Sequence, residues 1–222
     1  MVPIFDQLEL VRDLEPQRAA LNMAIDEALL EQAMGPVLRT YRWQRPALSF
    51  GYFGLFADVS EQANDHELVR RWTGGGIVPH GKDITYSIVI PRSHQLFAKS
   101  SLEIYSLLHR AIREALATKG VEADLARIAG PKISENCFAN PVRADLLIDG
   151  RKIAGAAHRR NRAGLLHQGS IQLPNFSGDF ADVFAGVLCH RLKQRPLSQE
   201  LLERAITIEQ AKYGTEQWLK RR

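Results

Sequence analysis

The stretch Arg70-Arg71-Trp72-Thr73-Gly74-Gly75-Gly76-Ile77-Val78-Pro79-His80-Gly81 is the most informative in the chain. Two arginines close an expected strand, three glycines follow, and a second apolar run begins at once. Glycine triplets are costly in regular structure, so they mark left-handed backbone or backbone that approaches something closely. With arginines before it and His80 after it, such a loop can offer N–H groups and positive charge to an anionic or carbonyl-bearing ligand. A tight hairpin explains it equally well, because it matches neither the phosphate loop nor the dinucleotide fingerprint.

The hydrophobic pattern around this loop predicts an α+β fold. Helices are expected before residue 121 at 16–34, at 60–66, which is short and polar, and from Ser100 or Ser101 to Gly120. Strands are expected at 37–43, 47–52, about 67–72 and 84–90. A strand-rich block follows at roughly 121–128, 143–149, 152–160 and 164–173, with a turn at Asp149-Gly150. From about 178 the pattern is helical, near 179–189, 197–204 and 208–220. This order predicts one domain over 1–222, with a mixed, mostly antiparallel sheet flanked by helices and a helical C-terminal segment from about 175.

The composition is that of an ordinary globular protein. The 222 residues are 45% hydrophobic and 24% charged, with a net charge of +4. Basic residues cluster only at 158–162 and 220–222, which is too few to predict nucleic-acid binding but suits an acidic protein partner. The N-terminus lacks a basic region followed by an apolar run, and no stretch approaches the ~18 apolar residues of a membrane span. We therefore expect a cytoplasmic protein with no membrane and no nucleic-acid partner.

The two cysteines, Cys137 and Cys189, predict neither a disulfide framework nor a metal site, because no Cys/His cluster surrounds them. Cys189 lies in an apolar helical stretch and is interpreted as a buried hydrophobe. Cys137 lies on an irregular segment near basic residues, where a thiol can ionise more readily and accept an acyl group. A small buried side chain is the alternative interpretation of Cys137.

Lys152 follows the turn at Asp149-Gly150, in the run Gly150-Arg151-Lys152-Ile153-Ala154-Gly155. A lysine there can bind a carboxylate or phosphate, or stabilise charge on an acyl oxygen. The alternative is a lysine that faces solvent at a hairpin. The candidate general bases are His80, His158 and His167, each of which can instead be structural. No GxSxG elbow indicates a serine hydrolase.

Taken in order, five motifs resemble the lipoate–protein ligase and octanoyltransferase family, which is related to the biotin protein ligases and has a class II synthetase-like fold. The motifs are an opening helix at 22–30, a first hairpin at 38–43 and 46–52, the glycine loop at 70–80 with Thr85-Tyr86-Ser87, a lysine hairpin at 149–155 and a strand at 166–171. Each motif alone is weak, whereas five in the family's order are specific. The resemblance covers the chain from the first helix to about residue 173.

The resemblance implies that a lipoyl or octanoyl group lies in a tunnel and is transferred to a lysine of a lipoyl carrier domain. Lys152 would contact the acyl carbonyl or an acyl-adenylate phosphate, and His80 would line the entrance. The substrate-binding residues carried over from the motifs are Arg70, Arg71, Gly74, Gly75, Gly76, His80 and Gly155. On this interpretation the glycine triplet, Cys137 and Lys152 face one cavity.

Two mechanisms are open within the family. In one branch a cysteine takes octanoyl from acyl carrier protein as a thioester, with no cofactor, and its Cys-Phe…Pro motif lies fifteen residues before the hairpin lysine, as Cys137-Phe138-Ala139-Asn140-Pro141 does here. The other is a ligase that needs ATP and Mg and acts through lipoyl-adenylate. The third glycine favours the ligase, because the cysteine-using branch often carries arginine there. Ligases commonly add an accessory C-terminal domain, for which the about fifty residues after 173 leave no room, so a ligase would need a separate partner protein.

Pro79 before His80, and Gly81-Lys82 after it, depart from the family's pattern and bear on the substrate contacts. A catalytically silent acyl-carrier-binding protein is a third interpretation, since fold does not guarantee activity. The first prediction is the transferase, with Cys137 as the acyl-enzyme nucleophile and Lys152 as its electrostatic partner.

Overall fold

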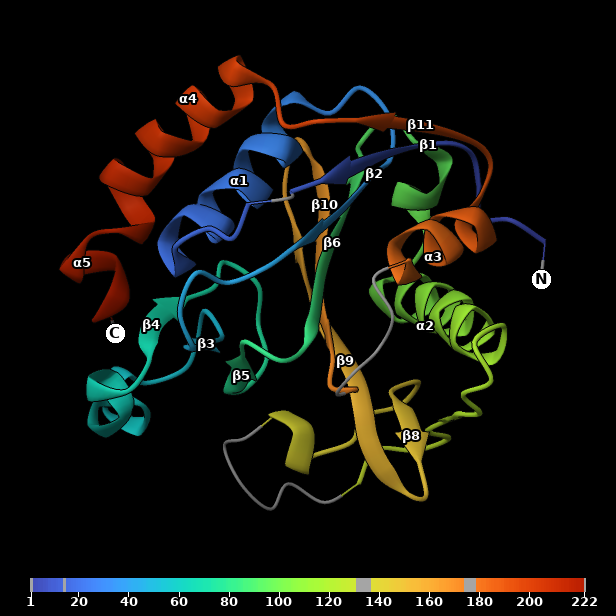
Figure 1. Ribbon diagram of the computed structural model, residues 1–222, viewed down its shortest axis with the longest axis horizontal. Helices are drawn as coiled ribbons and strands as arrows, with labels where there is room; N and C mark the ends of the chain where they lie inside the picture. The colour runs from blue at the N-terminus through green and yellow to red at the C-terminus, as the bar shows by residue number, and fades with distance from the viewer. Residues whose placement is uncertain (1, 14, 131–136, 174–178, 222) are drawn as a thin grey trace.

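Figure 1 shows the computed structural model, which describes residues 2–13, 15–130, 137–173 and 179–221, with the backbone alone for Cys137. The strands are β1 (Phe5–Arg12), β2 (Val37–Tyr41), β3 (Ala47–Phe50), β4 (Glu67–Arg70), β5 (Val78–His80), β6 (Ile84–Pro91), β7 (Asp124–Leu125), β8 (Leu146–Ile148), β9 (Arg151–Arg160), β10 (Gly164–Ile171) and β11 (Cys189–Arg195). The α-helices are α1 (Ala19–Gln32), α2 (Ser101–Ala117), α3 (Phe180–Leu188), α4 (Gln199–Ile208) and α5 (Glu216–Leu219). Short helical turns are η1 (Phe56–Asp58), η2 (Ser60–Asn64), η3 (Gln95–Ala98), η4 (Cys137–Ala139) and η5 (Glu209–Tyr213).

A mixed, mostly antiparallel sheet forms the centre of the molecule. Its strand order is β11-β1-β2-β6-β10-β9-β8-β7. β1 runs parallel to both of its neighbours, and every other pair of neighbouring strands is antiparallel. A second sheet of three strands places β3 between β4 and β5. The predicted α+β fold, with a mixed sheet flanked by helices, is confirmed.

The first hairpin expected from the motifs is wrong. β2 lies between β1 and β6, so both of its edges are already hydrogen-bonded. β3 therefore belongs to the small sheet, parallel to β4 and antiparallel to β5. This pairing also means that β4 and β5, which flank the glycine loop, are not a hairpin either. An alternating pattern shows that a segment is a strand, but it does not name the partner.

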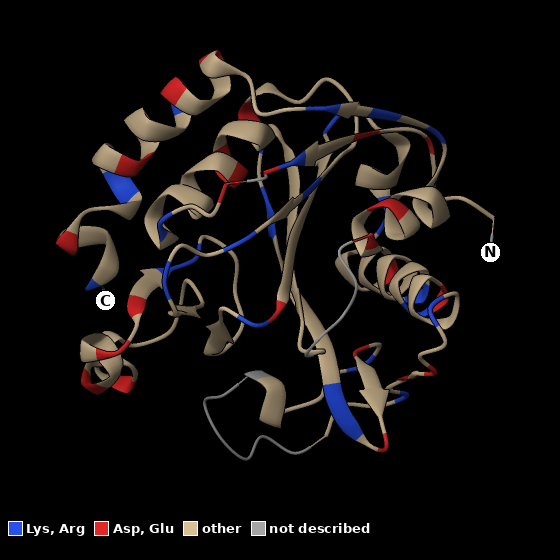
Figure 2. Ribbon diagram, in the orientation of Figure 1, with Lys and Arg blue, Asp and Glu red and all other residues tan. Residues whose placement is uncertain are grey.

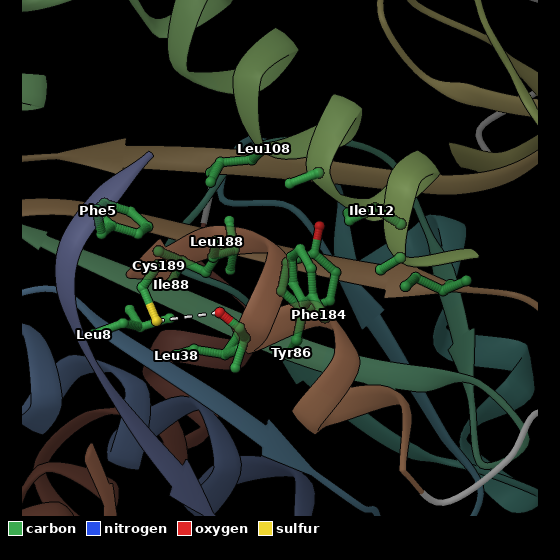
Figure 3. Packing of buried hydrophobic residues seen from close by; sticks show 14 of the residues in the cluster. Phe5, Leu8, Leu38, Tyr86, Ile88, Leu108, Ile112, Phe184, Leu188 and Cys189 are labelled. Atoms are coloured by element: carbon green, nitrogen blue, oxygen red, sulfur yellow. Dashed lines mark hydrogen bonds between the residues drawn. The ribbon is translucent and has the colours of Figure 1, made fainter. Parts of the chain in front are cut away.

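Helices cover the large sheet on both faces, with α2 and α3 on one face and α1 and α4 on the other (Figure 1). Figure 3 shows the first layer, in which Phe184 of α3 and Leu108 of α2 pack around Tyr86 of β6. The Tyr86 ring lies over Gly169 of β10, where a Cβ would overlap the ring. A close approach of this kind is one reason for a glycine inside a strand.

Two predictions made from local signals are confirmed. Ser100 caps α2: its side chain accepts a hydrogen bond from the Glu103 N–H, and the Glu103 carboxylate accepts one from the Ser100 N–H. Asp149 and Gly150 both have positive φ, 49° and 75°, as a two-residue turn between antiparallel strands requires. This turn places Lys152 at the start of β9.

The two ends of the chain differ from expectation. No strand was expected before residue 16 or in the C-terminal segment from about 175, yet β1 and β11 pair there in parallel. The helical segments expected near 179–189, 197–204 and 208–220 agree with α3, with α4 and with η5 and α5. The residues between the first two form β11, which is mostly polar and exposed at the sheet edge. Hydrogen bonds to β1, rather than a hydrophobic pattern, hold it as a strand. Within the described ranges, no helix is long and apolar enough to cross a membrane.

Candidate active site

A cavity lies between the large sheet and the glycine loop, which we define as the segment 71–77 that joins β4 to β5. Its empty space is about 430 Å³, a volume that includes space open to solvent. Its walls come from α1, both sheets, the glycine loop and η4. The lining residues are Met23, Tyr41, Trp43, Ser49, Arg71, Gly75, Val78, His80, Thr85, Phe138, Gly155, Ala156, Ala157, Gln168, Gly169 and Ser170.

Close backbone packing shapes the loop wall of the cavity. Gly75 has a φ of 90°, a conformation that favours glycine. Gly51, just after β3, lies against the loop, and a Cβ there would overlap the carbonyl oxygens of Gly74 and Gly75. A Cβ on Gly74, by contrast, would meet open space. The tight fit therefore depends on Gly51 and Gly75 rather than equally on all three glycines of the triplet.

Arg71 holds the glycine loop from the cavity side. Its guanidinium donates hydrogen bonds to the carbonyl oxygens of Gly74 (3.0 Å) and Gly76 (2.8 Å) and to Ser49 Oγ (2.6 Å). These three acceptors lie on two different segments, so the planar fork of donors joins the loop to β3. Arg71 is buried and lines the cavity, as the prediction of a substrate-binding role requires.

His80 continues this polar wall. Its Nε2 lies 2.6 Å from Ser49 Oγ, and its Nδ1–H donates to Asp83 Oδ2 at 2.8 Å. Burial raises the pKa of Asp83, but the charge of His80 and hydrogen bonds from His80, Ser170 and Thr85 outweigh it and hold that pKa below its usual value. The His80 ring stacks on Trp43, with ring centroids 4.1 Å apart. The result is a fixed imidazole beside an aromatic wall of the cavity.

Arg70 points elsewhere. Its guanidinium donates hydrogen bonds to the main-chain carbonyls of five residues: Tyr52, Gly54, Trp218, Leu219 and Arg221. The Trp218 indole N–H donates back to the Arg70 carbonyl at 3.0 Å. Arg70 is absent from the cavity lining and instead fixes the end of the chain beside the glycine loop. Its substrate-binding role stays a prediction.

Lys152 is buried at the β9 side of the cavity. Its ammonium lies 2.8 Å from Asp145 Oδ2, and the two side chains are 2% and 0% exposed. The lysine stem passes across Gly155, where a Cβ would overlap its Cε. The ammonium also lies 5.5 Å from the centroid of the Phe138 ring. Gly155 and Phe138 both line the cavity, so Lys152 adjoins it without being among the lining residues.

Helix α2 positions Asp145, the partner of Lys152. Ala144 has a φ of 71°, a strained conformation for a residue with a side chain. Its carbonyl accepts a hydrogen bond from His109 Nδ1 at 2.8 Å. The hydroxyl of Tyr105 donates to the Asp145 carboxylate, and the Val142 N–H donates to it at 2.7 Å. Removing any one of these contacts would loosen the carboxylate that holds Lys152.

Cys137 opens η4, and its side chain lies outside the described residues. The backbone of η4 packs against β9. Phe138, the next residue, lines the cavity beside Gly155. The placement of Cys137 at the same cavity therefore stays a prediction, supported by its neighbour.

The other histidine candidates, His158 and His167, lie beside Tyr105 of α2 and are absent from the cavity lining. His167 is hydrogen-bonded through Nδ1 to His158 Nε2 (2.5 Å) and through Nε2 to the Tyr86 hydroxyl (3.0 Å). Burial, with the charge of Arg160, lowers the pKa of His158 to about 4, and burial with neighbouring charge lowers that of His167 well below its usual value. Both imidazoles are therefore neutral near pH 7.

The structure thus brings four of the predicted substrate-binding residues to the cavity lining, namely Arg71, Gly75, His80 and Gly155. Three residues of the site had not been singled out from the sequence: Ser49, Asp83 and Asp145. Asp145 lies seven residues before Lys152, which is close enough to suggest a pair across the hairpin. Ser49 carried no comparable signal, because its role depends on the contact between β3 and β5.

Comparison with families and relatives gives one consistent result. The model of the lipoyl protein ligase A/B catalytic domain matches residues 18–212. A protein named octanoyltransferase LipM from Oceanobacillus iheyensis is 40% identical over 202 residues, which cover 87% of this chain and 73% of the relative. Another of that name, from Geobacillus kaustophilus, is 35% identical over 219 residues, which cover 87% of this chain and 78% of the relative.

Solved structures resemble this chain along almost its full length. A putative lipoate protein ligase from T. acidophilum with bound lipoic acid has a TM-score of 0.77 at 20% identity, covering 97% of this chain and 98% of that one. A lipoate-protein ligase A bound with ATP gives the same TM-score and identity and the same coverage. At this identity the similarity concerns the fold alone.

Proposed function

Since this chain belongs to the family of the lipoyl protein ligase A/B catalytic domain, we propose that it is an acyltransferase that moves an octanoyl or lipoyl group to a lysine of a lipoyl carrier domain. We further propose that residues 1–222 act as one catalytic unit in the cytoplasm. The two relatives described above, 40% and 35% identical and both named octanoyltransferase LipM, support octanoyl transfer in particular.

The observation that carries this proposal is the meeting of η4 and β9 at the cavity. η4 begins at Cys137, its next residue Phe138 lines the cavity, and Lys152 lies between the Phe138 ring and Asp145. A nucleophile at the start of η4 would therefore meet the carbonyl end of an acyl chain whose tail lies among Met23, Tyr41 and Trp43.

The proposed chemistry has two steps, and the donor we propose is an acyl carrier protein. The thiolate of Cys137 attacks the donor's thioester carbonyl, the bond to the donor sulfur breaks, and the donor leaves as a thiol with a proton. The ε-amine of the carrier lysine then attacks the Cys137 thioester, the carbon–sulfur bond breaks, and the amine's proton passes to the thiolate. Lys152, held by Asp145, places a cation where negative charge develops on the acyl oxygen. One thioester is consumed and one amide is formed, so no cofactor is required.

Intact mass measurement after incubation with octanoyl-acyl carrier protein tests this proposal. We expect the mass of one octanoyl group to be added, to survive denaturation, and to be absent in Cys137→Ala. Cys189→Ala is the matched control, because that thiol is buried in the α3 layer, and it should still gain the mass.

The alternative is a ligase that uses ATP and Mg and forms lipoyl-adenylate. Lipoate-dependent pyrophosphate exchange without any mass gain from the carrier would favour it and overturn the cysteine mechanism. Carrier binding with neither signal would identify a silent binding protein. Full transferase activity in Lys152→Ala would remove the assigned role of Lys152.

A further inference from the structure

Three aromatic and three cationic side chains gather beside the glycine loop, and none of them lines the cavity. We call this group the cationic platform: Tyr52, Trp72, Trp218, Arg159, Lys212 and Arg221. Arg159 comes from β9, Lys212 from η5, and Trp218 and Arg221 from the last residues of the chain. Segments far apart in the sequence thus build one surface.

Cation–π contacts hold the platform together. The Arg159 guanidinium lies 5.1 Å from the Tyr52 ring centroid and 4.9 Å from that of Trp72. The Arg221 guanidinium lies 4.0 Å from the Tyr52 ring, and the Lys212 ammonium lies 3.9 Å from the Trp72 ring. Such contacts keep the cations in place while leaving their charge uncompensated.

The charges of the platform are not balanced. Lys212 pairs with Glu27 at 2.5 Å. Among the described residues, Arg159 and Arg221 have no carboxylate partner, and Arg159 Nε is buried without a hydrogen-bond acceptor. Burial lowers the pKa of Lys212 more than its contact with Glu27 raises it, and the nearby charge of Arg159 lowers it as well. Within the described part of the chain, Glu27 is therefore the one carboxylate that forms an ion pair with these three cations. An incoming anionic surface would relieve their mutual repulsion.

Arg70 gives the platform its fixed shape. Its hydrogen bonds to the carbonyls of Trp218, Leu219 and Arg221 hold α5 and the residues after it against β4. Without them, Trp218 and Arg221 would not stay beside Tyr52. The first arginine of the glycine-loop motif therefore builds this surface, while the second faces the cavity.

An exposed apolar rim adjoins the cations. Phe53 is 83% exposed and Leu55 is 58% exposed. The Phe53 ring meets Tyr52 edge to face, with centroids 4.9 Å apart. Aromatic side chains together with arginine are the composition typical of protein interfaces. A small anion would gain nothing from this rim, whereas a folded partner would cover it.

We propose that the cationic platform docks an acidic face of the lysine-bearing carrier domain during acyl transfer. This rests on the proposed function, which requires such a protein to reach the cavity. Arg159 is two residues beyond Ala157 on the same face of β9, so the platform begins roughly 7 Å along the strand from the cavity wall. Trp72 is three residues before Gly75 in the same loop. A partner seated there can extend a lysine side chain over the glycine loop.

The double variant Arg159→Glu/Arg221→Glu tests the platform with octanoylated enzyme and a lipoyl carrier domain. We expect the KM for the carrier domain to rise at least tenfold, kcat to change less than twofold, and octanoyl-enzyme formation to keep its rate. Substituting lysine for acidic surface residues of the carrier domain should restore part of the lost affinity. Arg159→Gln/Arg221→Gln, which inserts no negative charge among the rings, should raise the KM by a smaller factor.

The matched control is Arg191→Glu/Lys193→Glu on β11, which makes the same change in net charge. Figure 2 shows the basic residues of β11, one edge strand of the large sheet, away from α5. Equal KM values for the two double variants would overturn the proposal. Slower octanoyl-enzyme formation with an unchanged carrier KM would also overturn it, by assigning the surface to the acyl donor.

A titration of unmodified carrier domain into the protein needs no catalysis. We expect binding that weakens with salt and is lost in Arg159→Glu/Arg221→Glu but kept in the β11 control. If acyl transfer itself fails while this pattern holds, the proposed function is wrong and the docking surface stands. An affinity for the carrier domain that changes neither with salt nor in the platform variants would exclude the cationic platform as its docking site.

Discussion

The glycine loop has an inner face, toward the cavity, and an outer face, toward the end of the chain. Adjacent arginines, Arg71 and Arg70, form the contacts of these two faces. Arg71 faces the cavity and binds Ser49 and the carbonyls of the loop itself. Arg70 faces outward and binds the carbonyls of the chain end. Successive residues at the end of a strand point to opposite sides, so a doublet there necessarily divides its two side chains. A motif written as two arginines therefore contains one residue that shapes the cavity and one that builds the surface around it.

The largest loss of stability should come from Arg70→Ala, which removes the hydrogen bonds on the outer face of the glycine loop. Five carbonyls lose their charged donor, and we expect the free energy of unfolding to fall by about 3 kcal/mol or more. Urea unfolding measures this loss, and trypsin should cleave after Lys220 or Lys212 faster than in the wild type. The rate of octanoyl-enzyme formation per folded molecule tests the separate prediction that Arg70 binds substrate, and an unchanged rate would exclude that role. A tail that stays protected would contradict the assigned role of Arg70.

Acid should weaken the protein without distinguishing the two faces of the loop, because the responsible histidines lie across the sheet. Burial lowers the pKa of His109 to about 3, and burial with Arg160 lowers that of His158 to about 4. In the unfolded chain each titrates near pH ~6.5 and binds protons that the folded protein does not. Stability is therefore present above that pH and is lost as the pH falls toward the folded pKa values, by about 2 kcal/mol for each histidine between pH 7 and 5.

Urea unfolding of wild type and His158→Gln across this range measures the effect. The variant should lose about 2 kcal/mol less on acidification. Arg70→Ala and Arg71→Lys should show the same pH slope as the wild type. A slope that differs between these two arginine variants would show that the loop, rather than the α2 layer, carries the acid sensitivity.

Arg71→Lys should impair the cavity side of the glycine loop while leaving the outer side intact. Lysine keeps the charge but lacks the planar fork that reaches Ser49, Gly74 and Gly76 together. We expect the rate of octanoyl-enzyme formation to fall about tenfold, equivalent to ~1.4 kcal/mol, while the free energy of unfolding changes less than in Arg70→Ala. Single-turnover acylation followed by mass spectrometry measures the rate. A loss of stability as large as that of Arg70→Ala, with acylation unchanged, would reverse the division between the two arginines.

Local chemistry explains which parts of the fold were predictable. The capping box at Ser100 and the turn at Asp149-Gly150 need only neighbouring residues, and both were found from the sequence. β11 was missed because its strand state depends on β1, which lies more than 180 residues away. Its polar residues carry no period that would reveal such a partner.

The site divides in the same way. The glycine-loop motif identified Arg71, Gly75 and His80, and the lysine hairpin identified Gly155; all four line the cavity. The glycine-loop motif did not distinguish the roles of Arg70 and Arg71. Side chains of successive strand residues point to opposite sides, but the sequence does not show which of the two points toward the cavity. The polar partners of these residues, such as Ser49 beside His80, come from other strands and become visible only when the small sheet is assembled.

The smallest effect on stability should come from the rim of the outer face. Phe53 is 83% exposed, so Phe53→Ala should change the free energy of unfolding by no more than about 0.5 kcal/mol. If a carrier domain covers this rim, the same substitution should raise the KM for the carrier about threefold and leave octanoyl-enzyme formation unchanged. Met34→Ala is the control, since Met34 is 94% exposed and follows α1 rather than the platform. Steady-state transfer at varied carrier concentration measures both. Equal KM values for the two variants would show that only the charged residues of the platform contribute to docking. A higher KM for Phe53→Ala alone would show that burial of the apolar rim also contributes to binding.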